Sequence, residues 1–561
     1  MTQTVRDQIR SALAAALAAA QDAGALPRIP TTEIGVERPS RPEHGDYASS
    51  VALRMAGIVG RKPLDVAEAI ASRIECGAMI EAVDVAAPGF INLRLTTAWK
   101  AAQIDAVLAA GDRWGTLDRG AGKRLQVEFV SANPTGPLQV GNGRGAVLGD
   151  TLAAVLVAAG YDVQREYYVN DAGAQIHAFA ETLYARYQQE LGRDASLPEG
   201  GYAGGYMVDL AREIVAEQGS AWLRPEGEVP PDALTERGLA LMIERIEADL
   251  ALLGVHFDTW FREKSLYESN GSESTYASAM TLLKESGVVR EHEGAIWFAS
   301  RQLGEDKDNV LVRRSGEPTY LASDIAYHYD KFVRRGFDRV INVWGADHQG
   351  HVSRVKAAAA VVGAPRDGLT IVLYQLVQLQ RGDERVRMSK RTGEIVTLRE
   401  LIEDVGKDVA RFFLLQRSAD AQMDFDLDRA TSQDPKQNPV YYVQYAHARA
   451  ASILRTANEV GLQPTGGHTA LLTEPEELTL VAEMLRLPEL IESMAESLEP
   501  HHLTAYALEL AQAFTQYYGA CRVVNVDHPD LSRARLKLTL AAKLVLARTL
   551  GLIGVDAPET M

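Results

Sequence analysis

One stretch of the sequence carries most of the information about the fold: Lys123-Arg-Leu-Gln-Val-Glu-Phe-Val130, followed directly by Ser131-Ala-Asn-Pro-Thr-Gly-Pro-Leu-Gln-Val-Gly-Asn-Gly-Arg144. The first segment is typical of a strand, and the second predicts a loop that leads into a helix reaching about Ala159. Residues 161–169 predict the next strand. Strand, helix and strand in this order form a βαβ unit, which implies parallel pairing with a right-handed crossover. The sequence therefore predicts an α/β protein with a Rossmann-type parallel sheet.

Three domains are predicted along the 561 residues. Residues 1–112 predict a smaller N-terminal α/β domain, which opens with an amphipathic helix and ends with strands at 82–86 and 90–95. Residues 113–403 predict the parallel-sheet domain, with a mostly helical insertion around 185–290 and further strands near 296–298, 309–313, 339–344 and 369–380. Residues 404–561 have a helical pattern and predict an all-α bundle.

The bulk composition is that of an ordinary soluble globular protein, with 46% hydrophobic and 24% charged residues. Cys76 and Cys521 are the only cysteines, a usage that favours a reducing cytoplasm. No run of about 18 apolar residues occurs, so a membrane partner is not expected. Nothing in the sequence suggests an obligate interface, and we expect a monomer. The net charge of −17 argues against nucleic acid, DNA included, but phosphate contacts need only a local basic face.

The loop before the long helix has the features of a phosphate-binding turn. A helix N-terminus presents unpaired N–H groups and the positive end of a dipole, so it attracts phosphate. Gly141 and Gly143 allow a close approach to the backbone, while Pro134 and Pro137 stiffen the entry. Glycines used for packing in an ordinary turn are the alternative, which a lone Gly-x-Gly does not exclude.

The surroundings of this loop resemble a known family. Residues 131–150 resemble the signature loop of class I aminoacyl-tRNA synthetases, whose usual core reads His-Ile-Gly-His, and the flanks Ala-Asn-Pro-Thr-Gly-Pro-Leu and Gly-Arg-Gly-Ala look specifically like arginyl-tRNA synthetase. Further stretches agree, namely Tyr168-Val-Asn-Asp-Ala-Gly-Ala-Gln175, Val343-Trp-Gly-Ala-Asp-His348, Asp408-Val-Ala-Arg-Phe-Phe413 and Asn438-Pro-Val-Tyr-Tyr-Val-Gln-Tyr-Ala-His-Ala-Arg449. The resemblance covers nearly the whole chain. It implies a catalytic domain at 113–403, a tRNA-contacting N-terminal domain and an anticodon-binding helical domain.

The resemblance places ATP on the signature loop. It implies that Gln139 and Asn142 are catalytic, because they stand where the family has its two signature histidines. The implied ATP-binding residues of this loop are Pro137, Leu138, Gln139, Gly141, Asn142 and Gly143. An amide can donate an N–H where an imidazole nitrogen would, but it cannot carry the positive charge that makes a hydrogen bond about twice as strong. We therefore expect activity with a weaker pH dependence near the pKa of histidine.

A second motif, Arg387-Met-Ser-Lys-Arg391, is similar to the family's Lys-Met-Ser-Lys signature, with arginine for the first lysine. Adenylate formation builds charge on the α-phosphate and on the departing pyrophosphate. A lysine on a flexible loop can bind that charge more strongly in the transition state than in the ground state. The resemblance implies Lys390 and Ser389 as catalytic residues, and adds Arg387, Met388 and Lys390 to the ATP-binding set. Taken alone, the motif also fits a solvated basic turn.

The resemblance implies five residues for an arginine pocket. A guanidinium prefers planar carboxylate partners, and Asp324 is assigned to it. Tyr320 precedes Asp324 by four residues and shares its face if the stretch is helical. Glu128 and Asn133 are placed near the ammonium and carboxylate of the substrate, and His348 stands where many relatives have glutamine. An exposed strand carboxylate is the alternative for Glu128.

A bound metal is not expected from the residues near His348. Asp347, His348 and His351 could be taken for a metal cluster, but no third histidine or cysteine lies close in sequence. Mg²⁺ is expected only as the companion of ATP.

Four residues are implied for binding tRNA. Phe90 and Asn92 match positions where relatives touch the outer corner of tRNA, and Tyr442 and Tyr445 lie three apart in the helical domain. The pair Tyr517-Tyr518 is a further aromatic candidate. Unpaired bases stack on such rings, although tyrosines used for packing are the alternative.

The leading hypothesis is an arginine–tRNA ligase that forms arginyl-adenylate from L-arginine and ATP, then passes the arginyl group to the terminal adenosine of tRNA(Arg). The resemblance implies that adenylate formation can require bound tRNA. The alternative is a catalytically impaired, synthetase-like tRNA-binding paralogue, for which only Gln139 and Asn142 speak. A dinucleotide-dependent oxidoreductase is disfavoured, because no Gly-x-Gly-x-x-Gly with an acidic residue about 20 positions later follows the first strand.

Overall fold

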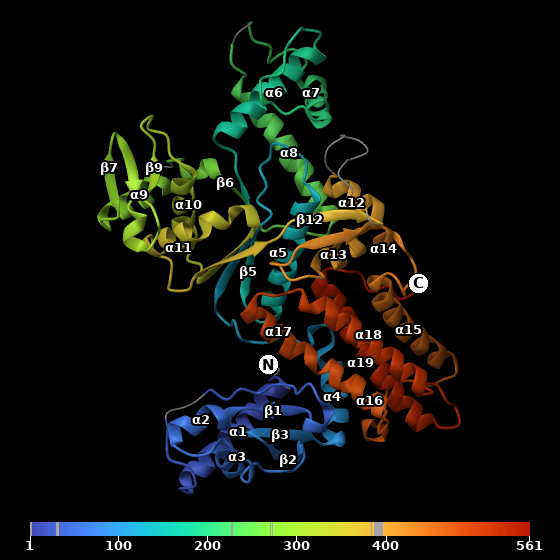
Figure 1. Ribbon diagram of the computed structural model, residues 1–561. Coiled ribbons are helices and arrows are strands. Elements are labelled where there is room, and N and C mark those ends of the chain that lie inside the picture. Colours follow the sequence, from blue (N-terminus) through green and yellow to red (C-terminus); the bar gives the residue numbers. More distant parts are fainter. Residues whose placement is uncertain are drawn as a thin grey trace.

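The centre of the protein is a five-stranded parallel sheet (Figure 1). The computed structural model describes residues 3–29, 33–225, 228–269, 271, 273–382, 384–385 and 396–561. The sheet has the order β11-β10-β4-β5-β6, and all four pairings are parallel. Its strands are β4 (Arg124–Phe129), β5 (Asp162–Val169), β6 (Thr259–Arg262), β10 (Arg339–Gly345) and β11 (Leu369–Tyr374). The predicted Rossmann-type parallel sheet is thereby confirmed.

Helix α5 (Val140–Ala158) packs directly on one face of this sheet. It can approach so closely because it carries glycine where a side chain would collide. A Cβ atom at Gly149 would lie 2.2 Å from Cγ of Phe129 on β4, and one at Gly145 would lie 2.7 Å from the Tyr374 hydroxyl on β11. These two glycines of the helix therefore serve packing.

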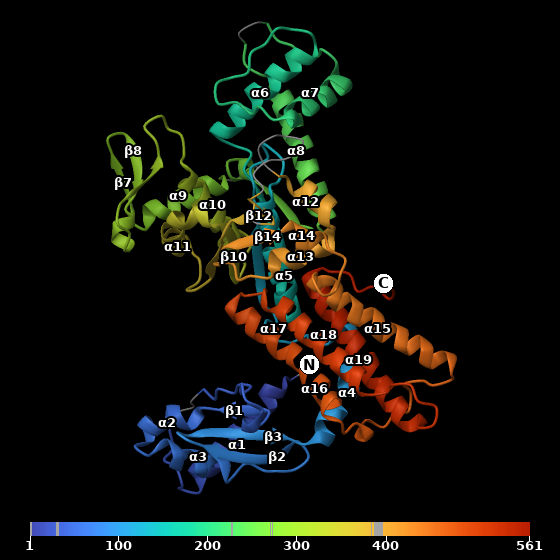
Figure 2. The ribbon, with the colours of Figure 1, turned by 45° about the vertical axis from the view of Figure 1, so that its right-hand side comes forward.

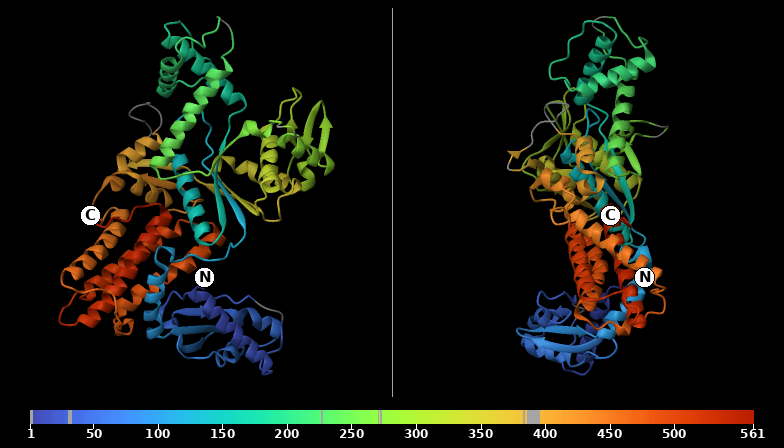
Figure 3. Two further views of the ribbon diagram at one scale, coloured as in Figure 1. Left: turned by 180° about the vertical axis from the view of Figure 1, so that it is seen from behind. Right: turned by 90° about the vertical axis from the view of Figure 1, so that its right-hand side faces the viewer.

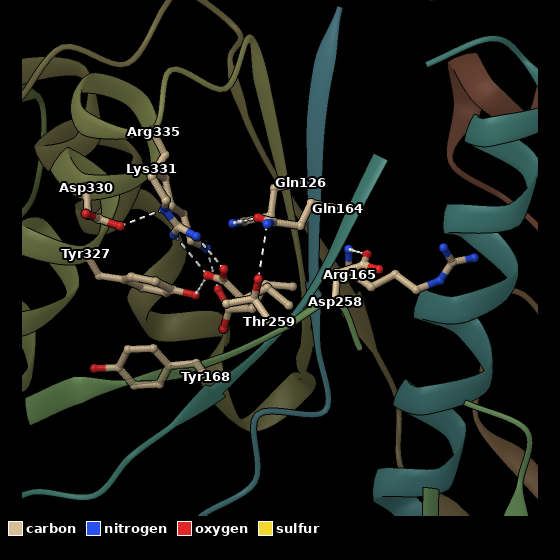
Figure 4. Close-up of polar contacts among 12 residues, drawn as sticks. Gln126, Gln164, Arg165, Tyr168, Asp258, Thr259, Tyr327, Asp330, Lys331 and Arg335 are labelled. Atoms are coloured by element: carbon tan, nitrogen blue, oxygen red, sulfur yellow. Dashed lines mark hydrogen bonds and ion pairs between the residues drawn. The ribbon is translucent and has the colours of Figure 1, made fainter. Parts of the chain in front are cut away.

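The opposite face of the sheet carries a row of polar side chains. Asn342, Glu128, Glu166 and Thr259 are neighbours in the register of β10, β4, β5 and β6, so their side chains point to the same side. Helix α10 (Tyr320–Tyr329) and the π-helical turn that follows it, Asp330–Arg334, cover this row (Figure 4). A buried polar row of this kind needs partners from the covering helix.

The N-terminal module is a three-stranded antiparallel sheet with helices. Its strands pair in the order β1-β3-β2. Helix α1 begins with a capping box, in which the Asp7 N–H donates to Thr4 Oγ1 at 3.0 Å and the Thr4 N–H donates to Asp7 Oδ2 at 3.1 Å. Its predicted apolar face of Ile9, Leu13 and Leu17 is buried. The elements are α1 (Val5–Asp22), β1 (Tyr47–Ser49), α2 (Val51–Val59), α3 (Pro63–Ala71), β2 (Ile80–Ala86), β3 (Phe90–Leu95) and α4 (Thr97–Ala110).

Two lobes extend the central sheet domain. Three helices, α6 (Ala174–Glu190), α7 (Gly205–Gln218) and α8 (Asp232–Leu252), form one lobe with its own apolar cluster. The second lobe contains α9 (Thr275–Glu285), β7 (Val289–His292), β8 (Ala295–Phe298), β9 (Asn309–Val312), α10 and α11 (Val352–Val361). The prediction of a mostly helical insertion around 185–290 missed β6, which is only four residues long and completes the edge of the central sheet.

A third small sheet lies beside the start of α5. It has the order β13-β12-β14, with β12 (Val377–Arg381), β13 (Glu384–Arg385) and β14 (Met423–Asp426). The prediction that the chain is helical from residue 401 onward was wrong at β14, which pairs in parallel with β12. The short helices around it are α12 (Leu398–Val405), α13 (Lys407–Leu415) and α14 (Leu427–Thr431).

The C-terminal part is helical, as predicted (Figure 2). Its helices are α15 (Pro439–Glu459), α16 (Pro475–Met484), α17 (Arg486–Ser497), α18 (His502–Ala520) and α19 (Pro529–Ile553). Arg411 of α13 is buried and joins these helices to the sheet domain, because it donates to the carbonyls of Ile553 at 2.6 Å and Leu253 at 3.0 Å and to Asp150 Oδ2 at 2.6 Å. In the described part of the chain no helix is long and apolar enough to cross a membrane.

The protein is elongated, with the N-terminal module at one end and α6–α7 at the other (Figure 3). The N-terminal module is attached to α17 through buried polar contacts. Arg38 Nε donates to Glu489 Oε2 at 2.8 Å, and the Tyr47 hydroxyl donates to Glu489 Oε1 at 2.5 Å. The domain boundaries drawn at 112/113 and 403/404 stay predictions.

Candidate active site

The loop after β4 turns sharply and is fixed to the neighbouring strand. Val130 and Ser131 both adopt left-handed backbone angles, with φ of 65° and 41°, which is a strained conformation for residues other than glycine and is common at functional sites. The Tyr167 hydroxyl donates to the Ala132 carbonyl at 2.7 Å, and the Tyr168 N–H donates to Ser131 Oγ at 3.1 Å. The loop is thus held rigidly at the carboxyl end of the parallel strands, where open α/β sheets bind ligands.

The start of α5 presents amide donors beside open space. Gln139 is the N-cap residue and is exposed. Its backbone N–H donates to Asn142 Oδ1 at 2.9 Å. Because this bond uses the amide oxygen, any further hydrogen bond donated by Asn142 comes from its Nδ2 group. A Cβ atom at Gly141 would meet nothing within 4 Å, whereas one at Gly143 would lie 2.6 Å from Leu398 Cδ1.

These two glycines therefore differ in their surroundings. Gly143 is required for the contact of α5 with α12, and Gly141 leaves the backbone accessible. Of the other two residues implied for ATP, Leu138 is buried and Pro137 is half-buried. Arg144, from the flank that is typical of the family, donates to the Gln375 carbonyl at 2.6 Å and the Ser418 carbonyl at 2.7 Å. Its position indicates a structural role.

The second motif falls outside the described residues. Arg387, Met388, Ser389 and Lys390 all lie there, and their predicted roles stay predictions. The chain resumes next to the first motif, since Thr397 forms an antiparallel bridge with Gln139 and the Leu398 N–H donates to the Leu138 carbonyl at 2.8 Å. Thr397, which follows Arg391 by six residues in the sequence, therefore lies beside the start of α5.

The five residues implied for arginine come from four elements. Glu128 lies on β4 and is buried, which excludes the alternative of an exposed strand carboxylate. Asn133 lies in the loop after β4, where its Nδ2 donates to Gln175 Oε1 at 2.5 Å. Tyr320 and Asp324 share one face of α10, as predicted, and the Tyr320 side chain is 52% exposed. His348 follows β10 in an exposed 3-10 turn (Ala346–His351).

The carboxylate of Glu128 is fixed on both oxygens. Lys331 Nζ donates to Oε2 at 2.6 Å, and Ser131 Oγ donates to Oε1 at 3.0 Å. Lys331 is fully buried, and it comes from the π-helical turn that follows α10 (Figure 4). Sequence reasoning did not find Lys331.

Asp324 has the most perturbed carboxyl group of the implied set. Burial raises its pKa to about 7, and the negative charges of Glu128 and Glu263 add to this rise, while Arg354 and Lys331 oppose it. A carboxyl group whose pKa lies near neutral pH and that is surrounded by other carboxylates is typical of a functional site.

Glu263 is a second residue that sequence reasoning missed. It follows β6 and is buried. Burial raises its pKa, and hydrogen bonds from Ser323 and Tyr168 oppose the rise. Its negative charge is one of the causes that raise the pKa of Asp324. Its only sequence signal is a charged residue directly after a short strand.

The turn of His348 shows no metal-binding geometry. His348 Nε2 lies 3.5 Å from Asp347 Oδ2, and its ring centroid is 6.1 Å from that of His351. Among the described residues no group of three or more His, Cys, Asp or Glu side chains could hold a metal ion.

The residues implied for tRNA differ in exposure. Phe90 is half-buried and Asn92 is buried, both on β3. Tyr442 is half-buried on α15, and Tyr445 is 43% exposed. The guanidinium of Arg449 lies 5.0 Å from the centre of the Tyr445 ring.

Arg449 was not found from the sequence, although it lies one turn after Tyr445. Its guanidinium also lies 5.5 Å from the centre of the Tyr518 ring, so it joins two exposed tyrosines of α15 and α18. Tyr517 is fully buried and donates to the Arg535 carbonyl at 2.9 Å. The hypothesis that Tyr517 stacks on a base was therefore wrong.

Three family models match the chain. They are the arginyl tRNA synthetase N terminal domain at residues 4–95, the tRNA synthetases class I (R) catalytic domain at 103–434 and the DALR anticodon binding domain at 443–561.

Similar proteins extend over nearly the same length. The arginine–tRNA ligase of Dehalococcoides mccartyi strain CBDB1 is 50% identical over 557 residues, covering 99% of both chains. That of Heliobacterium modesticaldum is 46% identical over 566 residues, covering 100% of this chain and 99% of its own. The solved structure of Thermus thermophilus arginyl-tRNA synthetase has a TM-score of 0.73 at 23% identity, covering 99% of this chain and 100% of its own, and shows the fold. The chain belongs to the arginyl-tRNA synthetase family.

Proposed function

We propose that the protein is an arginine–tRNA ligase, which activates L-arginine with ATP and transfers the arginyl group to the 3′-terminal adenosine of tRNA(Arg). The observation that carries the proposal is identity of 45–50% over nearly the full length to proteins named arginine–tRNA ligase. The alternative of a catalytically impaired paralogue is not favoured by this similarity. A monomer in the cytoplasm, without membrane or DNA as a partner, stays a prediction.

In the first step a carboxylate oxygen of arginine attacks the α-phosphorus of ATP, and the bond to pyrophosphate breaks. We place the phosphates at the start of α5, where Gly141 leaves the backbone open and Asn142 can donate through Nδ2. Gln139 is exposed beside them. Because these groups are N–H donors, they suit phosphate oxygens, and Mg²⁺ would take its ligands from ATP and water.

We place the substrate guanidinium at Asp324 and the ammonium and carboxylate near Glu128 and Asn133. Tyr320 and His348 complete the pocket from α10 and from the turn after β10. The strained Val130–Ser131 turn supports this assignment, because it aims the loop at the carboxyl end of the sheet.

The second motif supplies the remaining catalytic groups in this proposal. Lys390 would bind the charge that develops between the α-phosphate and pyrophosphate, with Ser389, Arg387 and Met388 nearby. The pairing of Thr397 with Gln139 supports it, because Thr397 follows the motif by six residues in the sequence and lies beside the start of α5.

In the second step a ribose hydroxyl of the terminal adenosine attacks the carbonyl carbon of the adenylate, and AMP leaves. The N-terminal module and the helical domain would hold the tRNA. We propose Phe90 and Asn92 as contacts of its outer corner, and Tyr442 and Tyr445 as anticodon contacts.

Charging of purified tRNA(Arg) with radiolabelled arginine and Mg-ATP tests the proposal, together with ATP–pyrophosphate exchange with and without the tRNA. Charging, with exchange that appears only when tRNA is present, is the expected result. Absence of both charging and exchange, with tRNA still bound, would support the non-catalytic paralogue instead.

A further inference from the structure

A chain of buried hydrogen bonds connects two of the implied arginine-binding residues from below the pocket. Lys331 Nζ donates to Glu128 Oε2 at 2.6 Å and to Asn342 Oδ1 at 3.1 Å. Asn342 Nδ2 lies 3.1 Å from His328 Nε2, and His328 Nδ1 lies 2.7 Å from the backbone carbonyl oxygen of Asp324. This series of hydrogen bonds therefore starts at Glu128 on β4 and ends at Asp324 on α10.

The polarity of this chain follows from its first donor. The ammonium of Lys331 can only donate, so Asn342 accepts through Oδ1 and donates through Nδ2. His328 Nε2 must then be the acceptor, which leaves Nδ1–H to donate to the Asp324 carbonyl. Burial, helped by the positive charge of Lys331, lowers the pKa of His328 to about 3, which keeps its ring neutral.

The positive charge of Lys331 is committed to Glu128. Lys331 is fully buried, and its Nζ lies 4.0 Å from the centre of the Tyr327 ring, so the ring face shields the remaining side of the ammonium. The neighbouring carboxylate, Glu166, has its own cation, because Arg335 Nη1 and Nη2 donate to it at 2.5 and 3.0 Å.

The covering helix brings these groups to one side. Asp324, His328 and Lys331 are spaced four and three residues apart, which places them on one face of α10 and the turn that follows. Lys331 lies in the π-helical turn Asp330–Arg334, and such turns are frequent at functional sites. The face that carries Asp324 is therefore the same face that holds Glu128.

We propose that Lys331 is a positioning residue for the substrate arginine, which acts through Glu128 directly and through Asn342 and His328 on Asp324. It holds Glu128 in one orientation as an ionised acceptor, and it compensates part of the negative charge of the pocket before the substrate arrives. This inference rests on the function proposed above.

Steady-state charging kinetics of Lys331→Met, Lys331→Arg and Glu128→Gln/Lys331→Met test this role. A hydrogen bond to a charged group corresponds to about a tenfold to hundredfold effect on binding. Lys331→Met should raise the KM for arginine by that factor and leave the KM values for ATP and tRNA within about twofold. Lys331→Arg keeps the charge and should recover most of the loss.

The double variant tests whether Lys331 acts through Glu128. In the Glu128→Gln background, Lys331→Met should raise the KM for arginine by a clearly smaller factor than in the wild type, because the route through Glu128 is already lost and only the route through Asn342 and His328 remains. A matched control is Arg535→Met, which breaks the buried pair of Arg535 Nε and Glu477 Oε1 (2.7 Å) in the helical domain. It should lower thermal stability without changing the KM for arginine.

An unchanged KM for arginine in Lys331→Met, or equal rises for arginine, ATP and tRNA, would overturn the positioning role. Full additivity with Glu128→Gln would overturn the route through Glu128. Should Lys331→Met not fold, Lys331→Gln keeps a donor, loses the charge and carries the same comparison. Wild-type protein that charges no tRNA(Arg) would instead refute the proposed function.

Discussion

Use of arginine should depend on pH through Asp324, whose pKa is raised to about 7. Burial is the main cause, the charges of Glu128 and Glu263 add to it, and Arg354 and Lys331 oppose it. A guanidinium is bound well only by the ionised carboxylate. About one tenth of Asp324 is ionised at pH 6 and about nine tenths at pH 8, so kcat/KM for arginine should rise about tenfold between these values.

The raised pKa of Asp324 also affects the stability of the free protein, in the opposite direction: activity should rise with pH, whereas stability should fall. The unfolded chain has the ordinary aspartate pKa near 4, so between about pH 4 and pH 7 the folded state binds more protons, and stability falls as pH rises through this window. The difference between an ordinary pKa near 4 and a pKa of about 7 corresponds to about 4 kcal/mol. Since Asp324 is only partly buried, solvent screening reduces the expected cost to the order of 1–3 kcal/mol.

Asp324→Asn removes this cost together with the binding charge. At pH 8 the free energy of unfolding of the variant should exceed that of the wild type by this cost, on the order of 1–3 kcal/mol. At pH 5 the difference should be smaller. The kcat/KM of the variant for arginine should be low and independent of pH. Thermal unfolding at pH 5 and 8 and charging kinetics from pH 6 to 8 measure both effects, with kcat/KM for ATP at saturating arginine as the control. A flat arginine profile of the wild type, or a variant no more stable at pH 8, would refute the reasoning.

Five further substitutions test the two motifs and the tRNA interface. Gly143→Ala should lower the free energy of unfolding by about 1–3 kcal/mol because its Cβ would collide with α12, whereas Gly141→Ala should leave stability intact and raise the KM for ATP; equal effects of the two on stability would contradict the assignment. Lys390→Ala should lower the rate of pyrophosphate exchange about 10²- to 10³-fold, and a change confined to the KM for arginine would argue against its role. Gln139→His should make the rate depend on pH near the histidine pKa, and an unchanged pH profile would remove Gln139 as a phosphate donor. Tyr445→Ala should raise the KM for tRNA about tenfold, as expected for a stacked base, and an unchanged KM would place Tyr445 outside the interface.

Local patterns predict the parts of the fold that depend on neighbours in sequence. The strand at 123–130 and the helix to 159 follow from apolar spacing and from the turn residues between them. By contrast, β14 is a four-residue strand between helices, and its partner β12 lies more than 40 residues earlier. Such short strands form because a distant edge is present, so their own sequence does not predict them.

The candidate site shows the same division. The resemblance selected Tyr320 and Asp324, and their spacing predicted one shared face if the stretch is helical. Helix α10 confirms that condition. Lys331 continues that face, but its partner Glu128 lies 203 residues earlier in the sequence, and only the folded structure brings the two together. The position of Glu263 depends likewise on a tertiary contact, the pairing of β6 with β5 at the edge of the sheet.

The polar row under the pocket is the place where this sequence departs from what stability alone favours. A central strand of a parallel sheet is normally filled with apolar residues, and buried ion pairs seldom stabilise a fold more than apolar packing would. Here Glu128 and Glu166 lie on adjacent strands, and they pair with Lys331 and Arg335 from the segment that follows α10. A site for a substrate with two cationic groups gains from charges that are fixed before binding, because little reorganisation is then needed. The pocket above Glu128 therefore best explains why a glutamate lies in the middle of a buried strand. A charged residue at a position that normally carries an apolar one marks Glu128 as a candidate functional residue.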